Sequence, residues 1–204
     1  RPKPDTKRLL RVLQDRARNV ISSRYGLGES HERMTLESIG KLYGITRERV
    51  RQIENYALDS IRKSEIFRKE QDLFKSLQES IYSLGAIVSE QDLLKELSEK
   101  ADLVNHLKLY LVLGDAFKRV KEDDHFKDRW HVDDELSKQV HAALQELFKN
   151  LSDADLVPES EMIAMFLEQL KGVAEKYKEE EILRRWLRLS KKLDRNPLGE
   201  WGIA

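Results

Sequence analysis

Residues 35–54, TLESIGKLYGITRERVRQIE, decide the fold of the N-terminal part of the chain. Thr35 and Thr46 each precede a run of residues with helical spacing of apolar side chains, and threonine at such a position caps a helix. Gly44 supplies the left-handed conformation that a tight turn between two helices requires. The sequence therefore predicts two short helices joined by a glycine turn, which is a helix-turn-helix.

The apolar positions of these two helices define the faces that we expect to be buried. In the first helix they are Leu36, Ile39 and Leu42. In the second helix they fall within a sector of about 80°, which is the width of a packing face: Val50, Ile53, Ala57 and Ile61.

The opposite face of the second helix carries side chains that can read base edges, namely Arg47, Glu48, Arg51, Gln52 and Asn55. Arginine can chelate guanine, glutamine and asparagine can chelate adenine, and glutamate can accept a hydrogen bond from the cytosine amino group. Arg49 lies on the flank, where a phosphate contact is more natural. The alternative is a solvated face on which Arg and Glu only pair with one another.

The charge is distributed unevenly although the net charge is +0. Residues 1–68 contain 16 Lys and Arg against 9 Asp and Glu, whereas the other 136 residues contain 21 against 28. A basic block suggests a polyanionic partner, so this split favours the DNA-binding interpretation of the N-terminal part.

Three runs carry a family resemblance: LQDRARNVISSRYGL (13–27), MTLESIG (34–40) and GITRERVRQIE (44–54). Together they closely resemble region four of the sigma-70 family, over about residues 7–63. The resemblance implies that Arg47, Glu48, Arg51 and Gln52 read the upstream promoter hexamer in the major groove of double-stranded DNA. It also implies that Arg49 and the start of the Thr35 helix contact the DNA backbone, and that the domain docks on the flap of RNA polymerase.

Two features depart from the family pattern. Ala17 stands where the family often carries a glutamate, which affects the helix surface more than base reading. Region four normally ends a sigma factor, whereas this chain continues for well over a hundred residues after Ser64.

The rest of the chain contains an internal repeat. Residues 87–94, IVSEQDLL, align with residues 156–163, LVPESEMI, and each unit then closes with a tryptophan, Trp130 or Trp201. Each unit is expected to contain three helices and a hairpin, with strands at 117–120 and 129–132 in the first. The sequence thus predicts a mainly α protein with a helix-turn-helix domain (1–68) and two tandem winged-helix-like domains with short β-hairpins (69–132 and 133–204).

The two repeats differ in charge. The third helix of the first repeat, residues 102–113, has almost no positive charge and is expected to be packed. The second repeat carries a cationic cluster that could contact phosphate: Arg184, Arg185, Arg188, Lys191 and Lys192. An equally good interpretation is that these cations stabilise a helix C-terminus and balance Glu179, Glu180 and Glu181.

Catalytic and metal-binding patterns are lacking in the sequence. Asp123-Asp124-His125 is typical of a turn rather than a metal site, and the other histidines, such as His131 and His141, are expected on solvated faces. No phosphate-cradling loop or nucleophile motif occurs, so we expect no enzyme activity, cofactor, metal or small-molecule substrate. With no cysteine, disulfides and Cys-ligated zinc are excluded.

The sequence also leads to expectations about where the protein is located and whether the chain is part of a longer protein. No stretch approaches the roughly 18 apolar residues of a membrane span, and the opening RPKPD lacks a signal core, so a cytoplasmic protein without a membrane partner is expected. The chain starts without methionine and is expected to be a piece of a longer protein.

The sequence-based hypothesis is a DNA-binding transcription regulator that associates with RNA polymerase. Two alternatives stay open. One is a polymerase-binding adapter that uses the resemblance only for docking. The other is the targeting region of a DNA-modifying enzyme.

Overall fold

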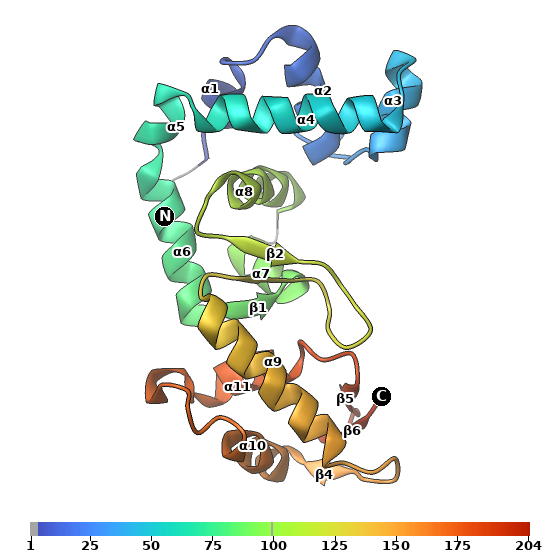
Figure 1. Cartoon of the computed structure of the whole chain (residues 1–204), viewed down its shortest axis with the longest axis vertical. Helices are drawn as coiled ribbons and strands as arrows, with labels where there is room; N and C mark the ends of the chain where they lie inside the picture. Colours follow the sequence, from blue (N-terminus) through green and yellow to red (C-terminus); the bar gives the residue numbers. More distant parts are fainter. Residues whose placement is uncertain (1–3, 99) are drawn as a thin grey trace. The chain divides into compact units, whose positions relative to one another are not determined.

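The computed structural model describes residues 4–98 and 100–204 and is mainly helical, with two small antiparallel sheets (Figure 1). The chain divides into two compact units. Unit 1 comprises Arg1–Leu77 and Leu94–Asp115, and unit 2 comprises Gln78–Leu93 and Ala116–Ala204. The chain thus passes from unit 1 to unit 2 within one helix and returns within the next.

The elements of unit 1 include the predicted helix-turn-helix. They are α1 (Thr6–Leu10), α2 (Asp15–Tyr25), α3 (Leu36–Tyr43), α4 (Arg47–Arg62), α5 (Glu65–Lys69) and α8 (Ala101–Leu113). Helices α6 (Gln71–Leu84) and α7 (Glu90–Leu97) each cross the boundary between the units. The sequence pattern that begins at Ser89 predicts a helix to about Glu99. Helix α7 ends at Leu97, and Glu99 itself lies outside the described residues.

Unit 2 contains the short strands and the remaining helices. They are β1 (Ile87–Ser89), β2 (Lys118–Val120), β3 (Arg129–His131), α9 (Asp134–Lys149), β4 (Val157–Pro158), α10 (Glu159–Glu168), η1 (Glu175–Tyr177), α11 (Glu180–Leu187), β5 (Leu193–Arg195) and β6 (Glu200–Ile203). None of the described helices is both long and apolar enough to cross a bilayer.

The turn between α3 and α4 has the predicted geometry. Gly44 adopts the left-handed conformation, with φ of 67°, and its amide donates to the Gly40 carbonyl. Gly40 is required for a different reason, because a Cβ there would lie 2.7 Å from the Ile45 carbonyl oxygen. Gly44 therefore permits the backbone conformation of the turn, and Gly40 permits the close approach of the Ile45 backbone.

The packing face of α4 is confirmed, whereas one position on α3 was predicted wrongly. Val50, Ala57 and Ile61 are fully buried and Ile53 nearly so. Leu42 is 64% exposed rather than buried. At 100° per residue Leu42 lies about 120° around the helix from Leu36, on the flank of the face that Leu36, Ile39 and Gly40 bury.

Helix α8 packs against the helix-turn-helix within unit 1, as its lack of positive charge predicted. Asn105 is buried and donates from Nδ2 to the carbonyl oxygens of Gly26 (3.1 Å) and His31 (2.9 Å). At the other end of this helix, Arg62 of α4 donates from Nη2 to the Val112 carbonyl at 2.8 Å. The core of unit 1 therefore includes a helix from far outside residues 1–68.

Unit 2 contains two three-stranded antiparallel sheets with strand orders β1-β3-β2 and β4-β6-β5. The predicted hairpin strands of the first repeat appear one residue or so shorter than expected. Strands β1 and β4 were not predicted at all, because two or three residues are too few to display alternation. The two missed strands occupy the stretches that align as a sequence repeat.

The same side-chain cluster recurs at both sheets. Val88 lies opposite Trp130 on the neighbouring strand, and the Trp130 indole donates to Glu90 Oε1 at 3.1 Å. Arg119, also opposite Trp130, donates to both carboxylate oxygens of Glu90, at 3.1 and 3.3 Å.

In the second sheet, Val157 lies opposite Trp201, whose indole donates to Glu159 Oε1 at 3.3 Å. Arg195, opposite Trp201, lies 3.5 Å from the same carboxylate oxygen. Each sheet is thus fastened to the helix that follows its first strand by an equivalent Glu, Trp and Arg.

The loop between β2 and β3 is held against the second repeat. Asp123 Oδ1 accepts from the backbone amides of His125 and Phe126, which confirms the predicted turn chemistry. Phe126 forms a bridge with Ser190, and the Lys191 amide donates to the His125 carbonyl at 2.8 Å. This loop is therefore part of the packed structure of unit 2.

Candidate nucleic-acid interface

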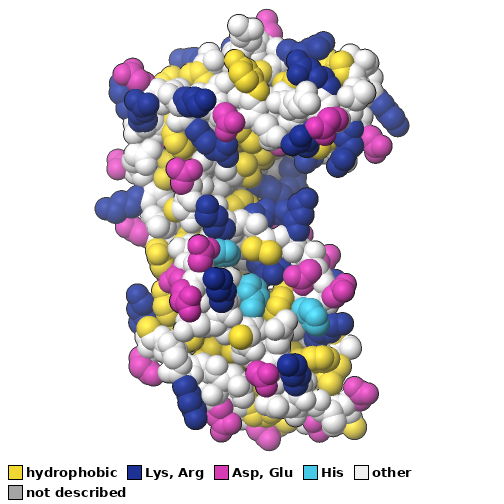
Figure 2. Space-filling model, in the orientation of Figure 1, with side chains coloured by type: hydrophobic (Ala, Val, Ile, Leu, Met, Phe, Trp, Pro, Cys, Tyr) yellow, Lys and Arg dark blue, Asp and Glu magenta, His cyan; other side chains and the backbone are white. Residues whose placement is uncertain are grey.

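Most of the side chains predicted to meet DNA belong to the first half of α4 and its N-cap, and Thr35 is the N-cap of α3. All of them are exposed: Thr35, Thr46, Arg47, Glu48, Arg49, Arg51, Gln52 and Asn55. Lys and Arg side chains gather over α3 and the start of α4 on the face that Figure 2 shows. The buried face of α4 turns these polar side chains away from the core of the domain.

Within residues 4–98 and 100–204, the side-chain hydrogen bonds of the α4 members of this set join these residues to one another. Arg51 donates to both carboxylate oxygens of Glu48, from Nε at 2.9 Å and from Nη2 at 2.6 Å. Arg49 Nη1 donates to Gln52 Oε1 at 3.3 Å. The hydrogen bond and charge of this pair lower the pKa of Glu48 and raise that of Arg51, so both stay charged at neutral pH. Partners three residues apart on an exposed helix are readily exchanged for a ligand.

The two capping threonines fix where α3 and α4 begin. Thr46 Oγ1 accepts from the Arg49 amide, and Thr35 Oγ1 accepts from the Ser38 amide, both at 3.1 Å. The other amides of each first turn point out of the helix end, where they can bind a phosphate. The threonines thus serve the fold and also mark two backbone positions that could meet DNA.

A partly buried cluster of three polar side chains, Arg24, Tyr25 and Glu54, links α2 to α4. Glu54, whose side chain is 12% exposed, lies 3.4 Å from Arg24 Nε and accepts from the Tyr25 hydroxyl at 3.4 Å. Burial and the Glu54 charge raise the pKa of Tyr25 above its usual range, so the hydroxyl remains a donor. The sequence analysis missed this cluster because its members are thirty residues apart.

The second predicted cationic cluster is largely committed to internal ion pairs. Arg184 donates to Glu159 and Glu180, and it contacts Glu181 as well. Arg188 Nε donates to Asp92 at 3.0 Å. The pairing with Glu180 and Glu181 matches the balancing interpretation of this cluster.

The remaining cations of this cluster are less engaged. Lys191 Nζ donates to the Asp123 carbonyl at 3.1 Å and lies 3.6 Å from Glu122. Among the described residues, Arg185 and Lys192 have no ion-pair partner within 4.0 Å.

Two histidines were wrongly expected on solvated faces. His131 is buried, and His141 is half-buried and accepts at Nε2 from Arg129 Nε at 2.8 Å. Burial and the Arg129 charge lower the pKa of His141 to about 4. Within residues 4–98 and 100–204, no group of three His, Asp or Glu side chains could hold a metal ion.

Comparison with known proteins places this geometry in a family context. Residues 9–63 match the family model "Sigma-70, region 4". This finding confirms the resemblance expected over about residues 7–63, and we call this part the region-4-like domain. Its exposed face at the start of α4 is therefore the face of a sigma-factor-like helix-turn-helix.

One curated relative is the RNA polymerase principal sigma factor HrdD of Streptomyces griseus, with 46% identity over 55 residues. The match covers 27% of this chain and 16% of that protein, so the chain spans only a small part of the relative's length. No solved structure matches the chain.

Proposed function

We propose that the chain binds a promoter-like DNA duplex sequence-specifically through its region-4-like domain, in association with RNA polymerase. The observation that carries the proposal is the exposed set of Arg47, Glu48, Arg51 and Gln52 on the first turns of α4. These side chains sit directly after a capped glycine turn. In the described part of the chain their side-chain hydrogen bonds stay within α4, so a duplex can engage them without disturbing the fold.

Each side chain of the set has a role that follows from its hydrogen-bonding groups. Arg51 exchanges the Glu48 carboxylate for guanine O6 and N7, which accept a bidentate guanidinium. Glu48, released from Arg51, accepts from a cytosine amino group. Gln52 and Asn55 face adenine, and Arg47 meets either a guanine or a phosphate.

Contacts to the DNA backbone position this helix. Arg49 pairs with a phosphate from the flank of α4. The amides capped by Thr35 and Thr46 offer further donors at two helix N-termini, where phosphate is favoured. Arg185, Arg188, Lys191 and Lys192 are proposed as weaker phosphate contacts in unit 2, with Arg184 held in place by its glutamates.

The chain's further organisation is part of the same proposal. The stretches 69–132 and 133–204 are proposed as two winged-helix-like domains. The recurring strand orders and the recurring Glu, Trp and Arg cluster support this assignment. In this proposal the two winged-helix-like domains contact RNA polymerase, other proteins or flanking DNA without catalysing a reaction. The protein is proposed to work in the cytoplasm. The region-4-like domain docks on the polymerase flap.

The test titrates two fluorescent duplexes, one with the sigma-70 upstream hexamer and one with a scrambled site, by anisotropy at several salt concentrations. We expect the full chain to prefer the hexamer. Arg51→Ala should cost about 1–3 kcal/mol of binding free energy and reduce the preference, as for other bidentate base contacts.

The control variant is Arg68→Ala, which removes one exposed cation from α5 outside the reading face. It should leave the preference between the duplexes unchanged. Equal binding of both duplexes by the wild-type chain, or an Arg51→Ala variant with unaltered preference, would contradict the proposal and favour a polymerase-binding adapter.

A further inference from the structure

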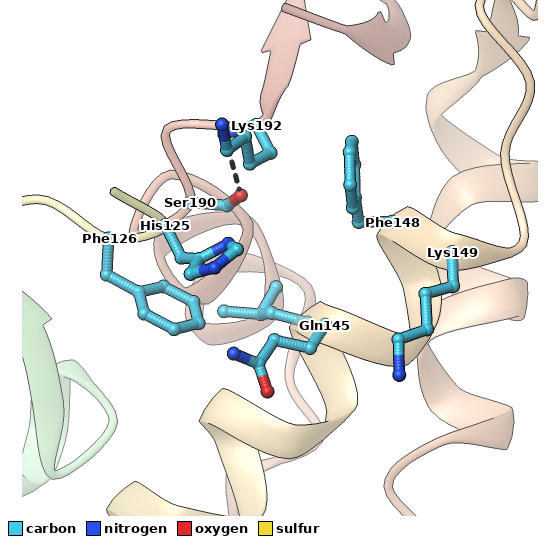
Figure 3. A pocket seen from close by; sticks show the side chains of 8 residues that line it. His125, Phe126, Gln145, Phe148, Lys149, Ser190 and Lys192 are labelled. Atoms are coloured by element: carbon cyan, nitrogen blue, oxygen red, sulfur yellow. Dashed lines mark hydrogen bonds between the residues drawn. The ribbon is translucent and has the colours of Figure 1, made fainter. Parts of the chain in front are cut away.

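A pocket of about 260 Å³ opens in unit 2 among three segments of chain (Figure 3). Phe126 comes from the loop after β2, Leu144 and Phe148 come from α9, and Ser190 follows α11. The aromatic and aliphatic side chains give the pocket an apolar interior. Unit 2 contains all of its walls, and none of the residues proposed to read DNA bases lines it.

The wall formed by Phe126 is fixed in place. Its ring lies 5.1 Å from the Arg129 guanidinium carbon and 4.5 Å from the centre of the His141 ring. Its amide donates to Asp123 Oδ1 at 2.8 Å. Because these contacts exist without a ligand, binding would cost little ordering of the pocket.

The rim of the pocket is cationic. Lys149 and Lys192 are among the eight lining residues, and none of the eight is acidic. Lys192 has no ion-pair partner among the described residues, while Lys149 lies 3.5 Å from Glu146 in a pair whose two side chains are both more than half exposed. An exposed pair of this kind gives way readily to another carboxylate.

Neutral donors complete the rim. Figure 3 shows Gln145 and His125 around the same space as Lys192 and Phe148. The Ser190 Oγ accepts from the Lys192 amide at 3.1 Å, which leaves its hydroxyl hydrogen free to donate. The pocket thus combines an apolar interior with a few convergent donors and a net positive charge, which is the usual composition of a small-ligand site.

We propose that this pocket binds a small aromatic carboxylate. Its volume lies below the range of about 300–1,000 Å³ that suits drug-sized ligands, so it fits one ring or two fused rings. The ring packs between Phe126 and Phe148, and the carboxylate pairs with Lys192. Gln145 and the Ser190 hydroxyl are the nearest further donors.

The test uses the ¹⁵N-labelled full chain and indole-3-acetate as the probe, followed by NMR titration. We expect saturable shifts at the amides of the lining residues. Indole-3-acetamide, which keeps the ring and loses the charge, should bind about tenfold more weakly. Lys192→Ala should weaken indole-3-acetate binding about fivefold, as expected for a partly exposed ion pair, and Lys192→Arg should restore it.

Two further variants separate loss of binding from loss of folding. Gln145→Glu adds a negative charge at an exposed rim position and should weaken the carboxylate without affecting the amide. Lys171→Ala removes an exposed cation that does not line the pocket, so binding should be unchanged.

Several outcomes would overturn the proposal. One is the absence of shifts at the lining residues, and another is equal affinity for the acid and the amide. A third is binding of the capped peptide Glu-Trp-Glu without binding of indole-3-acetate, which would make the pocket a protein-docking site.

Discussion

The start of α4 and the buried polar side chains of the two units use the same residue types in opposite ways. On α4, Arg51 and Asn55 are exposed, and Arg51 bonds to a neighbour three residues away. Asn105 in unit 1 is buried and bonds to carbonyls more than seventy residues away in the sequence. In unit 2, Arg129 is 5% exposed and donates to side-chain and backbone acceptors around the loop after β2.

This difference separates a binding surface from a structural contact. A polar group with an exposed, local partner loses little when it exchanges that partner for a ligand. A buried one leaves unsatisfied groups behind when it is removed. Substitutions on α4 should therefore change DNA binding at constant stability, and substitutions of the buried groups should lower stability.

The largest effect is expected from Arg129→Leu. It removes the Arg129 donors from Asp123 Oδ2, His141 Nε2 and two backbone carbonyls, and we expect a loss of about 3 kcal/mol in the free energy of unfolding. Urea titration followed by circular dichroism measures it. The matched substitution Arg51→Leu should leave the unfolding midpoint unchanged. A similar loss for both variants would mean that the exposed and the buried arginine contribute equally to stability.

A smaller loss is expected from Asn105→Ala, at about 2 kcal/mol, because the buried Gly26 carbonyl and the part-buried His31 carbonyl lose their donor. Thermal unfolding compares this variant with Asn55→Ala, which should lie within about 0.5 kcal/mol of the wild type. If Asn105→Ala were as stable as the wild type, α8 would contribute nothing to the region-4-like domain through this contact.

Stability should also fall on acidification because of His141. Its folded-state pKa of about 4 lies below the ordinary value of 6.5, so the unfolded chain binds a proton that the folded chain does not. The contribution is fully present above pH 6.5 and is lost as the pH falls toward 4, by at most about 1.4 kcal/mol per pH unit. Urea unfolding at pH 7.5 and 5.5 should show a smaller difference for His141→Gln, whereas His125→Gln, at an exposed position, should behave as the wild type.

The smallest effect is expected from Thr46→Ala. The Arg49 amide loses its cap, which should cost about 1 kcal/mol in stability. Thr46→Ser keeps the hydroxyl and should restore the wild-type melting temperature. A full loss with serine would mean that the threonine methyl group, rather than the cap, stabilises this turn.

The capping residues and the turn glycine were sufficient to predict the helix-turn-helix. They were insufficient to predict the tertiary contacts around it. Thr35, Gly44 and Thr46 act within a few residues, so the positions of α3, the turn and α4 followed from the sequence. The contacts of Asn105 and Arg129 depend on tertiary packing, which periodicity does not encode.

The exposure of the candidate base-reading side chains was predictable because they belong to one face of one helix, and their contact with DNA stays a prediction. Strands β1 and β4 were missed, yet a signal for them existed. They occupy the two most similar stretches of the sequence repeat, and apolar pairs such as Ile87 and Val88 recur there as Leu156 and Val157. A short apolar pair that recurs before a helix in both repeats is a usable sign of a short strand.

The positions of the tryptophans give the two units different optical signals. All three, Trp130, Trp186 and Trp201, belong to unit 2, and each is at most 2% exposed. Excitation near 295 nm therefore reports on unit 2 alone, while unit 1 contributes only tyrosine emission. Melting curves followed separately by tryptophan and by tyrosine emission would show whether the two units unfold in one cooperative transition or in two.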